Sequence, residues 1–180
     1  MKNPFATHYL QSVVAKFREQ KKLAERAFAQ LDDEQFFRAL DPESNSVAVM
    51  LQHMSGNMLS RWTNFLNSDG EKPDRNRDAE FVVAEGTTRA AVVERWEQGW
   101  RCLFQAIESL QPDDLNRQVY IRWQALSVVE AINRQLAHYA YHTGQIVFLA
   151  KHLKGGKWRS LSIPRDQSEV YKTREFQTKD

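Results

Sequence analysis

The sequence predicts an all-α protein built as a four-helix bundle. Four stretches carry apolar residues at three- and four-residue steps, which is the spacing of one face of a helix. Capping residues, Pro or Gly mark most of their ends. Residues 68–87, between the second and third stretches, make a longer connection than a tight antiparallel turn needs, so a crossover that leaves these two helices parallel is consistent with the spacing. We expect one domain over residues 1–180, since a chain of this length buries its own core.

The first two helices are predicted from their apolar stripes. Residues 5–31 place large apolar side chains on one stripe, which indicates an amphipathic helix. The second helix covers about residues 46–67 and begins at Ser46, a residue type favoured at the N-cap. Pro42 separates it from the first helix.

The last two helices have clearer boundaries. The third covers about residues 87–110, and Pro112 marks its end. The fourth covers about residues 127–153. Ser127 and Glu130 form the S-x-x-E capping box at its start, and two consecutive glycines follow its end.

The two halves of the chain resemble each other at an offset of near eighty residues. In each half, a long helix is followed by a short acidic run and then by a serine-capped helix that bears histidine. Two related helical hairpins would pack into one bundle, with sites between facing helices.

Composition limits the function classes. The chain has net charge +2, and residues 154–180 hold seven Lys and Arg against four Asp and Glu, so the excess belongs to an irregular, folded-back tail. Mixed charge of this kind argues against nucleic-acid binding. The single cysteine, Cys102, excludes an internal disulfide and a cysteine-based zinc site. An apolar leader and a long apolar window are both lacking, which favours a soluble, cytoplasmic protein with no membrane partner.

Three histidines are the candidate metal ligands. His138 and His142 are four residues apart, so they lie on one face of the fourth helix, and His53 lies in the second helix. Three imidazoles that meet between helices are the ligand set of an open metal site. The alternative is that each histidine separately hydrogen-bonds in the core or lies at the surface. The glutamate of the metalloprotease motif is absent, because its position is Tyr139.

Polar residues on the same stripes are candidates to support such a site. Asn57, Gln135 and Gln145 could orient the metal ligands. Arg61 and Arg134 are candidates to hold a substrate carboxylate, because each lies one or two turns from a histidine. The sequence does not identify a catalytic residue.

Other features favour structural roles. His8 and His152 lie near helix ends and are expected to be solvated. The charged loop after the second helix is expected to be a solvated rim, with Arg75 and Arg77 as weak candidates for anion contacts. Large aromatics supply buried area in a bundle, so all five tryptophans are predicted to fill the core and its seams: Trp62, Trp96, Trp100, Trp123 and Trp158.

The residues around the histidines resemble a known superfamily. Residues 138–146, HYAYHTGQI, are similar to the HxxxHxGQI signature of the DinB-like (YfiT-like) superfamily, which places another histidine on the second helix, where this chain has His53. Residues 69–78 and 157–164 resemble a branch of uncharacterised function. The resemblance implies an up-down-down-up bundle, often a homodimer, with a divalent metal such as zinc or nickel on His53, His138 and His142.

The resemblance leaves the reaction open. Some members of the superfamily are transferases or isomerases that use low-molecular-weight thiols such as bacillithiol or mycothiol. The leading hypothesis is a metal-dependent enzyme, a thiol transferase or a hydrolase, in which the ion activates a thiol or water against a small-molecule substrate. The alternative is a non-catalytic bundle in which the ion only ties two helices together.

A homodimer is also predicted from the fourth helix, which is apolar on two sides. A bundle helix needs only one core stripe. A tail or loop of the same chain could cover the second stripe instead. Ile146 and Leu149 lie with the histidines, and Val129, Leu136, Ala140 and Val147 lie roughly opposite.

Overall fold

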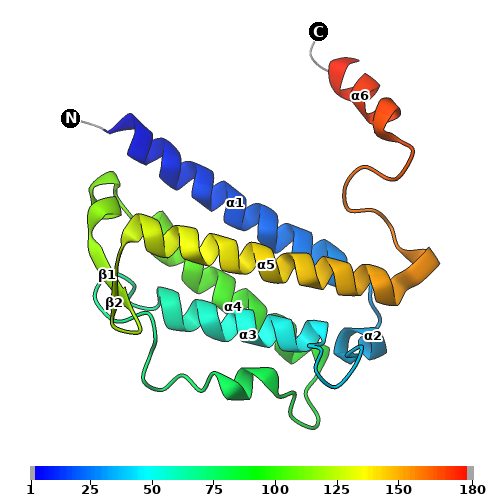
Figure 1. Cartoon of the computed structure of the whole chain (residues 1–180), viewed down its shortest axis with the longest axis horizontal. Coiled ribbons are helices and arrows are strands. Elements are labelled where there is room, and N and C mark those ends of the chain that lie inside the picture. The colour runs from blue at the N-terminus through cyan, green and yellow to red at the C-terminus, as the bar shows by residue number, and fades with distance from the viewer. Residues whose placement is uncertain (1–2, 178–180) are drawn as a thin grey trace.

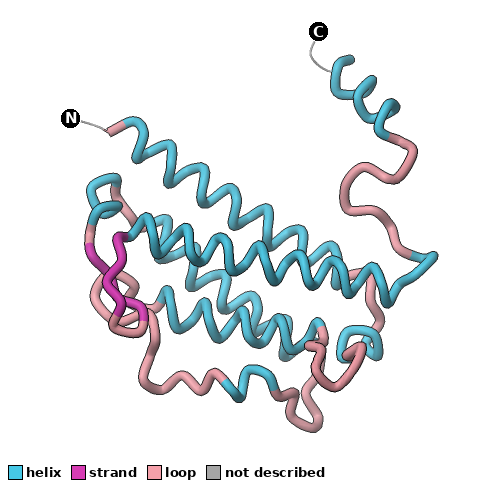
Figure 2. Tube along the Cα trace, viewed as in Figure 1, coloured by secondary structure: helices cyan, strands magenta, loops and turns pink. Residues whose placement is uncertain are grey.

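The computed structural model describes residues 3–177, with side chains described as far as residue 172, and four long helices pack in it as a bundle (Figures 1 and 2). Helices α1 and α5 run in one direction and α3 and α4 in the other (Figure 1), which confirms the all-α bundle and its up-down-down-up order. Each helix packs on two others: α1 on α4 and α5, and α3 on α4 and α5. The bounds are α1 Pro4–Phe28, α3 Val47–Trp62, α4 Arg89–Glu108 and α5 Val128–Lys154.

Side-chain caps fix the starts of these helices close to their predicted positions. The hydroxyl of Ser46 accepts a hydrogen bond from the Val49 backbone N–H at 3.2 Å, which satisfies one of the free donors of the first turn. Ser127 and Glu130 form the predicted capping box of α5. The crossover is also confirmed, because Arg89 at the start of α4 donates to the carbonyl oxygens of Phe28, the last residue of α1, and of Leu31 just after it.

Three predicted helices are shorter than expected. The first ends at Phe28, and the chain then forms a separate short helix, α2 (Asp33–Phe37), with its own capping box. The second ends at Trp62, five residues early, because Thr63 is extended with a ψ of 122° and Asn64 then adopts a left-handed φ of 50°. The third ends at Glu108 and is followed by the 3-10 helix η2 (Pro112–Asn116).

A β-hairpin before α5 was not predicted. Strands β1 (Gln118–Ile121) and β2 (Gln124–Ser127) pair antiparallel around a two-residue turn, in which Arg122 and Trp123 both have positive φ. Such turns favour Asn and Gly, which are absent here. The Asp69 carboxylate compensates, since it accepts hydrogen bonds from both turn N–H groups at 2.9 and 2.8 Å.

The crossover packs along the outer side of α3 and contains the 3-10 helix η1 (Asp78–Phe81) (Figure 1). Beyond α5, the 3-10 helix η3 (Gly155–Lys157) leads into the tail, where Arg159 exchanges two hydrogen bonds with Gln30, just after the end of α1. The tail is not wholly irregular as predicted, because it ends in helix α6 (Ser168–Gln177). Residues 178–180 lie outside the described residues.

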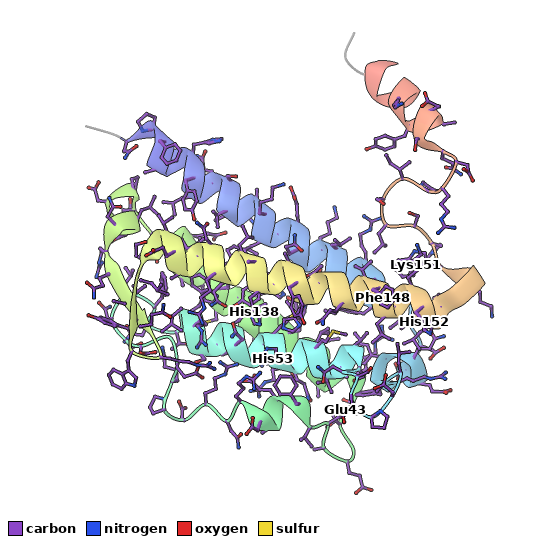
Figure 3. The ribbon with its side chains drawn as sticks, in the orientation of Figure 1. Glu43, His53, His138, Phe148, Lys151 and His152 are labelled. Carbon is purple, nitrogen blue, oxygen red and sulfur yellow. The ribbon has the colours of Figure 1, made fainter. Side chains whose placement is uncertain are left out.

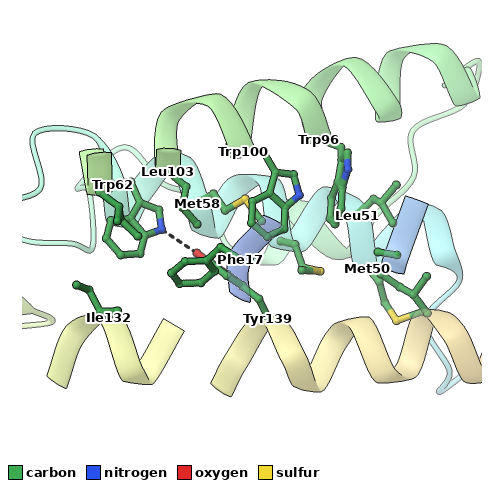
Figure 4. Close-up of a cluster of buried hydrophobic side chains, with 14 of the residues drawn as sticks. Phe17, Met50, Leu51, Met58, Trp62, Trp96, Trp100, Leu103, Ile132 and Tyr139 are labelled. Atoms are coloured by element: carbon green, nitrogen blue, oxygen red, sulfur yellow. Dashed lines mark hydrogen bonds between the residues drawn. The ribbon is translucent and has the colours of Figure 1, made fainter. Parts of the chain in front are cut away.

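The core is rich in aromatic side chains (Figure 4). Phe17 of α1 packs against Trp62, Trp100 and Tyr139, with ring centroids 5.9 to 6.3 Å apart. Full burial of each such ring stabilises the fold by roughly 2 kcal/mol or more. The prediction for the tryptophans was right for Trp62, Trp96 and Trp100, which are buried, and Trp158, which is half-buried. It was wrong for Trp123, which is 89% exposed, because the turn holds it at the hairpin tip.

The described helices include none with the length and apolar character needed to cross a membrane.

Candidate metal centre

The three predicted histidines meet between α3 and α5. The Nε2 atom of His138 lies 3.4 Å from Nε2 of His53 and 3.1 Å from Nε2 of His142. His53 and His138 come from facing sides of the two helices, whereas His152 lies toward the far end of α5 (Figure 3). His53 and His142 are buried and His138 is half-buried. The three side chains could hold one metal ion.

Helical geometry explains why α5 supplies two of these rings and a core residue from adjacent positions. His138 and His142 are one turn apart and share a face, whereas Tyr139 is rotated by about 100° and points into the core. Its hydroxyl accepts a hydrogen bond from Trp62 Nε1 and donates to Asn57 Oδ1 at 3.0 Å. Tyr139 therefore connects Trp62 in the aromatic core to Asn57, which lies one turn after His53 on α3.

The crossover orients His53. Its Nδ1 atom lies 2.9 Å from Oε2 of Glu80, which belongs to η1. An ionised carboxylate can only accept a hydrogen bond, so Nδ1 carries the proton and Nε2 of the neutral ring carries a lone pair. The Phe81 ring packs on the imidazole with centroids 4.7 Å apart. A carboxylate behind a histidine is the common way to orient a metal ligand.

His142 is oriented from its own helix. Its Nδ1 atom lies 2.8 Å from Oε1 of Gln145, whose amide nitrogen donates to the Tyr141 hydroxyl at 3.0 Å. With Nδ1–H donating to an amide oxygen, Nε2 of His142 also carries a lone pair. Gln145, predicted as a supporting residue, thus does contact a histidine.

The donor set fits a divalent metal ion. The Nε2 lone pairs of His53 and His142 both face Nε2 of His138, and a proton on His138 could satisfy only one of them. A shared cation would satisfy all three. Two nitrogens that bind one tetrahedral zinc ion at about 2.05 Å are about 3.3 Å apart, close to the 3.1 and 3.4 Å observed here.

Burial keeps the rings of His138 and His142 neutral. Burial, followed by the charges of His142 and His53, lowers the pKa of His138 to about 3. Burial, followed by the charge of His53, lowers the pKa of His142 to about 4. Near pH 7 both rings are therefore in the neutral form that a metal requires.

Glu80 belongs to a buried charge network. Arg75 donates to both of its carboxylate oxygens at 2.8 Å. Burial raises the pKa of Glu80, but hydrogen bonds from His53 and Arg75 outweigh it, so the net shift is downward. The prediction that this loop is a solvated rim is therefore partly wrong, because Arg75 and Glu80 have largely buried side chains.

Glu71 extends this network to the hairpin. It accepts hydrogen bonds from Arg61, Arg75 and Arg122. Partial burial raises the pKa of Glu71, but hydrogen bonds from Arg122 and Arg61 and the charges of Arg61 and Arg75 lower it to about 2. Arg61 also donates to the Gly70 carbonyl, so this predicted substrate contact is held firmly by the crossover.

A cavity of about 220 Å³ opens beside the histidines. It brings together four of the predicted supporting residues, namely Asn57, Arg61, Arg134 and Gln135, while Gln145 lies behind His142. Its other lining residues are His53, His138, Arg75, Arg77 and Arg122.

A larger cavity of about 740 Å³ lies between the crossover, α3 and α4, and its lining includes Gln52, Ser60, Lys72 and Arg95. Glu80 and Arg75 also line it. We place the chemistry at the smaller cavity, because that one contains His53 and His138.

Sequence reasoning missed Glu80, which lies 27 residues after His53 in a loop with many charges. One signal was present. Gly56 is in the interior of α3, where glycine is unfavourable and often marks a close approach. A Cβ atom at Gly56 would lie 2.2 Å from Oε1 of Glu80, so the glycine makes room for this carboxylate.

The family of the chain can now be stated. Residues 4–167 match the family described as a protein of unknown function, DUF1572. The chain belongs to this family. DUF1572 is a DinB-like family, in agreement with the resemblance found in the sequence, and the match includes all three histidines. No curated protein and no solved structure matches the chain. The DUF1572 match assigns no activity.

Proposed function

We propose that this DUF1572 protein binds one divalent metal ion through the Nε2 atoms of His53, His138 and His142 and is a metal-dependent enzyme acting on a small molecule. The observation that carries the proposal is the convergence of three Nε2 atoms, two of them on rings whose Nδ1 atoms donate to Glu80 and Gln145. Zinc and nickel are the proposed ions, since both bind neutral imidazole well.

An open site supports an enzyme over a purely structural ion. Among the side chains that the structure describes, up to residue 172, the group able to share one ion consists of the three histidines, without a fourth His, Cys, Asp or Glu. Glu80 is occupied by His53 and Arg75. Three protein ligands beside a cavity are the arrangement of catalytic zinc sites, whereas structural sites are closed by four.

The proposed reaction uses an external nucleophile. A divalent ion would supply Lewis acidity that favours the deprotonated form of a thiol or water near pH 7. Cys102 lies on α4 beside Thr63, outside the histidine cluster, so the chain offers no thiol of its own there. We therefore propose a low-molecular-weight thiol as co-substrate. The protein's part is to hold the rings with Glu80 and Gln145 and to position the substrate with the cavity's arginines.

Metal content tests the proposal. Untagged protein should contain about one zinc or nickel ion per chain by plasma mass spectrometry, and His138→Ala or His142→Ala should lose it. His152→Ala, which removes an exposed histidine from the same helix, should keep it. Full metal content in both ligand variants would reject the assignment.

A second measurement separates the enzyme from the structural alternative. The cobalt-substituted protein should change its visible absorption when bacillithiol, mycothiol or glutathione is added, since thiolate ligation alters the cobalt spectrum. An unchanged spectrum at saturating thiol would leave water as the nucleophile to test. A site that binds metal but no added ligand at all would favour the non-catalytic bundle.

We also propose a homodimer, on a different surface from the one that the sequence indicated. Val129, Leu136 and Val147 pack partly buried against the core of the same chain and need no second copy. Tyr141 and Phe148, by contrast, leave α5 about two-thirds exposed. Light scattering at micromolar concentration should give twice the chain mass, and Phe148→Glu should give a monomer. A monomer mass for the unaltered chain would reject the dimer.

A further inference from the structure

The small cavity beside the histidines is lined by an unusual number of guanidinium groups. Five arginines come together there from four parts of the chain: Arg61 from α3, Arg75 and Arg77 from the crossover, Arg122 from the hairpin and Arg134 from α5. We propose that this cavity binds a small anion with carboxylate or phosphate groups, and that this anion is the charged part of the substrate. The anion site does not depend on the proposed function; only the identification of the anion as a substrate does.

The charges of these arginines are only partly compensated. Glu71 and Glu80 pair with Arg61, Arg75 and Arg122, which leaves three positive charges in excess over the two carboxylates. Arg134 donates to a neutral amide, that of Gln124, at 3.3 Å. The carboxylate nearest to Arg77 is that of Asp78, which is 3.9 Å away and solvent-exposed. Arg77 and Arg134 therefore have donors and charge to offer to a ligand.

Two buried polar atoms on cavity-lining side chains also need a partner. Nε of Arg61 donates to no described group, and Oε1 of Gln135 accepts from none, although the two residues are only 5% and 3% exposed. A buried polar group without a partner costs about 1–3 kcal/mol. Both atoms are screened from the open cavity, so a ligand that carries an anionic oxygen and a hydroxyl group would satisfy them once the two side chains turn toward it.

Size narrows the ligand further. The volume of about 220 Å³ is below the roughly 300–1,000 Å³ of pockets for drug-sized molecules. Guanidinium groups match carboxylate and phosphate oxygens in a two-bond fork, and several of them favour more than one negative charge. The geometry thus points to a compact polyanion whose other end lies next to His53 and His138.

Calorimetry on the full-length protein as purified tests this inference. The probes are inorganic phosphate and malate, a hydroxy-dicarboxylate, each titrated at constant ionic strength. We expect saturable binding of at least one probe, weakened about tenfold in Arg134→Gln and in Arg77→Gln. Both side chains are exposed, so their replacement should leave the fold intact. Arg101→Gln, an exposed arginine of α4 outside the cavity, should bind as tightly as the unaltered protein.

The two probes and the metal content separate the outcomes. Preference for phosphate or for malate identifies the anionic group. Absence of binding for both probes, or equal weakening in Arg101→Gln, would overturn the inference even if the protein carries its metal. Arginine-dependent binding by a protein that contains no metal would instead reject the proposed function and leave the anion site standing.

Discussion

Helices α3 and α5 each present histidine to the site but hold it in different ways. His53 depends on Glu80, 27 residues later, and through Glu80 on the buried guanidinium of Arg75. His142 depends on Gln145, three residues later on the same helix. The first support exists only when the crossover has folded onto α3, whereas the second forms with the helix itself. The hydrogen bond that orients His142 is therefore local in sequence, whereas the one that orients His53 depends on tertiary structure.

The two supports also differ in energy. Removing one partner of a buried ion pair leaves an uncompensated charge and costs about 3–5 kcal/mol. Loss of a neutral hydrogen bond costs about 0.5–1.5 kcal/mol. Damage to the α3 side should therefore weaken both stability and metal binding, and damage to the α5 side should mainly weaken metal binding.

The largest effect is expected from Glu80→Gln. It removes the negative charge between His53 and Arg75, so we expect the free energy of unfolding to fall by about 3 kcal/mol and metal affinity to fall 10- to 100-fold. Urea unfolding and chelator competition measure the two effects. Asp78→Asn, an exposed change two residues away, should alter neither. An unchanged metal affinity would mean that Glu80 does not orient His53.

The next largest effect on metal affinity is expected when a glycine of α3 is replaced and compared with a glycine of α5. Gly56→Ala places a Cβ atom against the carboxyl group of Glu80 and must displace it, so metal affinity should fall about tenfold despite the better helix propensity of alanine. Gly144→Ala on α5 meets no atom within 4 Å and should stabilise the protein by about 1 kcal/mol. Metal affinity is again measured by chelator competition. Equal affinity in the two variants would mean that Gly56 does not make room for the Glu80 carboxylate.

Gln145→Ala should have a smaller effect, confined to the α5 side. His142 loses its hydrogen-bond acceptor, so metal affinity should drop severalfold, up to about tenfold, while the free energy of unfolding changes by less than about 1 kcal/mol. Gln145→Glu retains an acceptor and should restore the affinity. If Gln145→Glu folds but does not restore the affinity, Gln145 does not orient His142.

The pH dependence tests the charge network at Glu71. Its folded pKa of about 2 lies below its ordinary value of 4.5, so the ionised carboxylate stabilises the fold above pH 4.5. That contribution is lost as the pH falls toward 2. In urea unfolding, Glu71→Gln should be less stable than the unaltered protein at pH 6, and the difference should shrink below pH 4.5. A difference that is constant with pH would contradict the ion pairs.

The comparison also explains how much the sequence could predict. Helix starts at Ser46 and Ser127 and the pairing of His138 with His142 depend on neighbours three or four residues apart, and all were predicted. Glu80 and the hairpin turn were not predicted, because their partners lie 27 or more residues away and no motif marks them, whereas His53 was found through the superfamily signature. Trp123 was misplaced for the same reason, since Asp69 holds its turn at the surface.

In the proposed site, three imidazole nitrogens hold one ion. X-ray absorption at the edge of the bound metal counts those ligands directly. We predict three imidazoles at about 2.0–2.1 Å in the unaltered protein, with oxygen completing the coordination, and two imidazoles in any metal that His53→Ala retains. A sulfur ligand from Cys102, or only two imidazoles in the unaltered protein, would contradict the site proposed here.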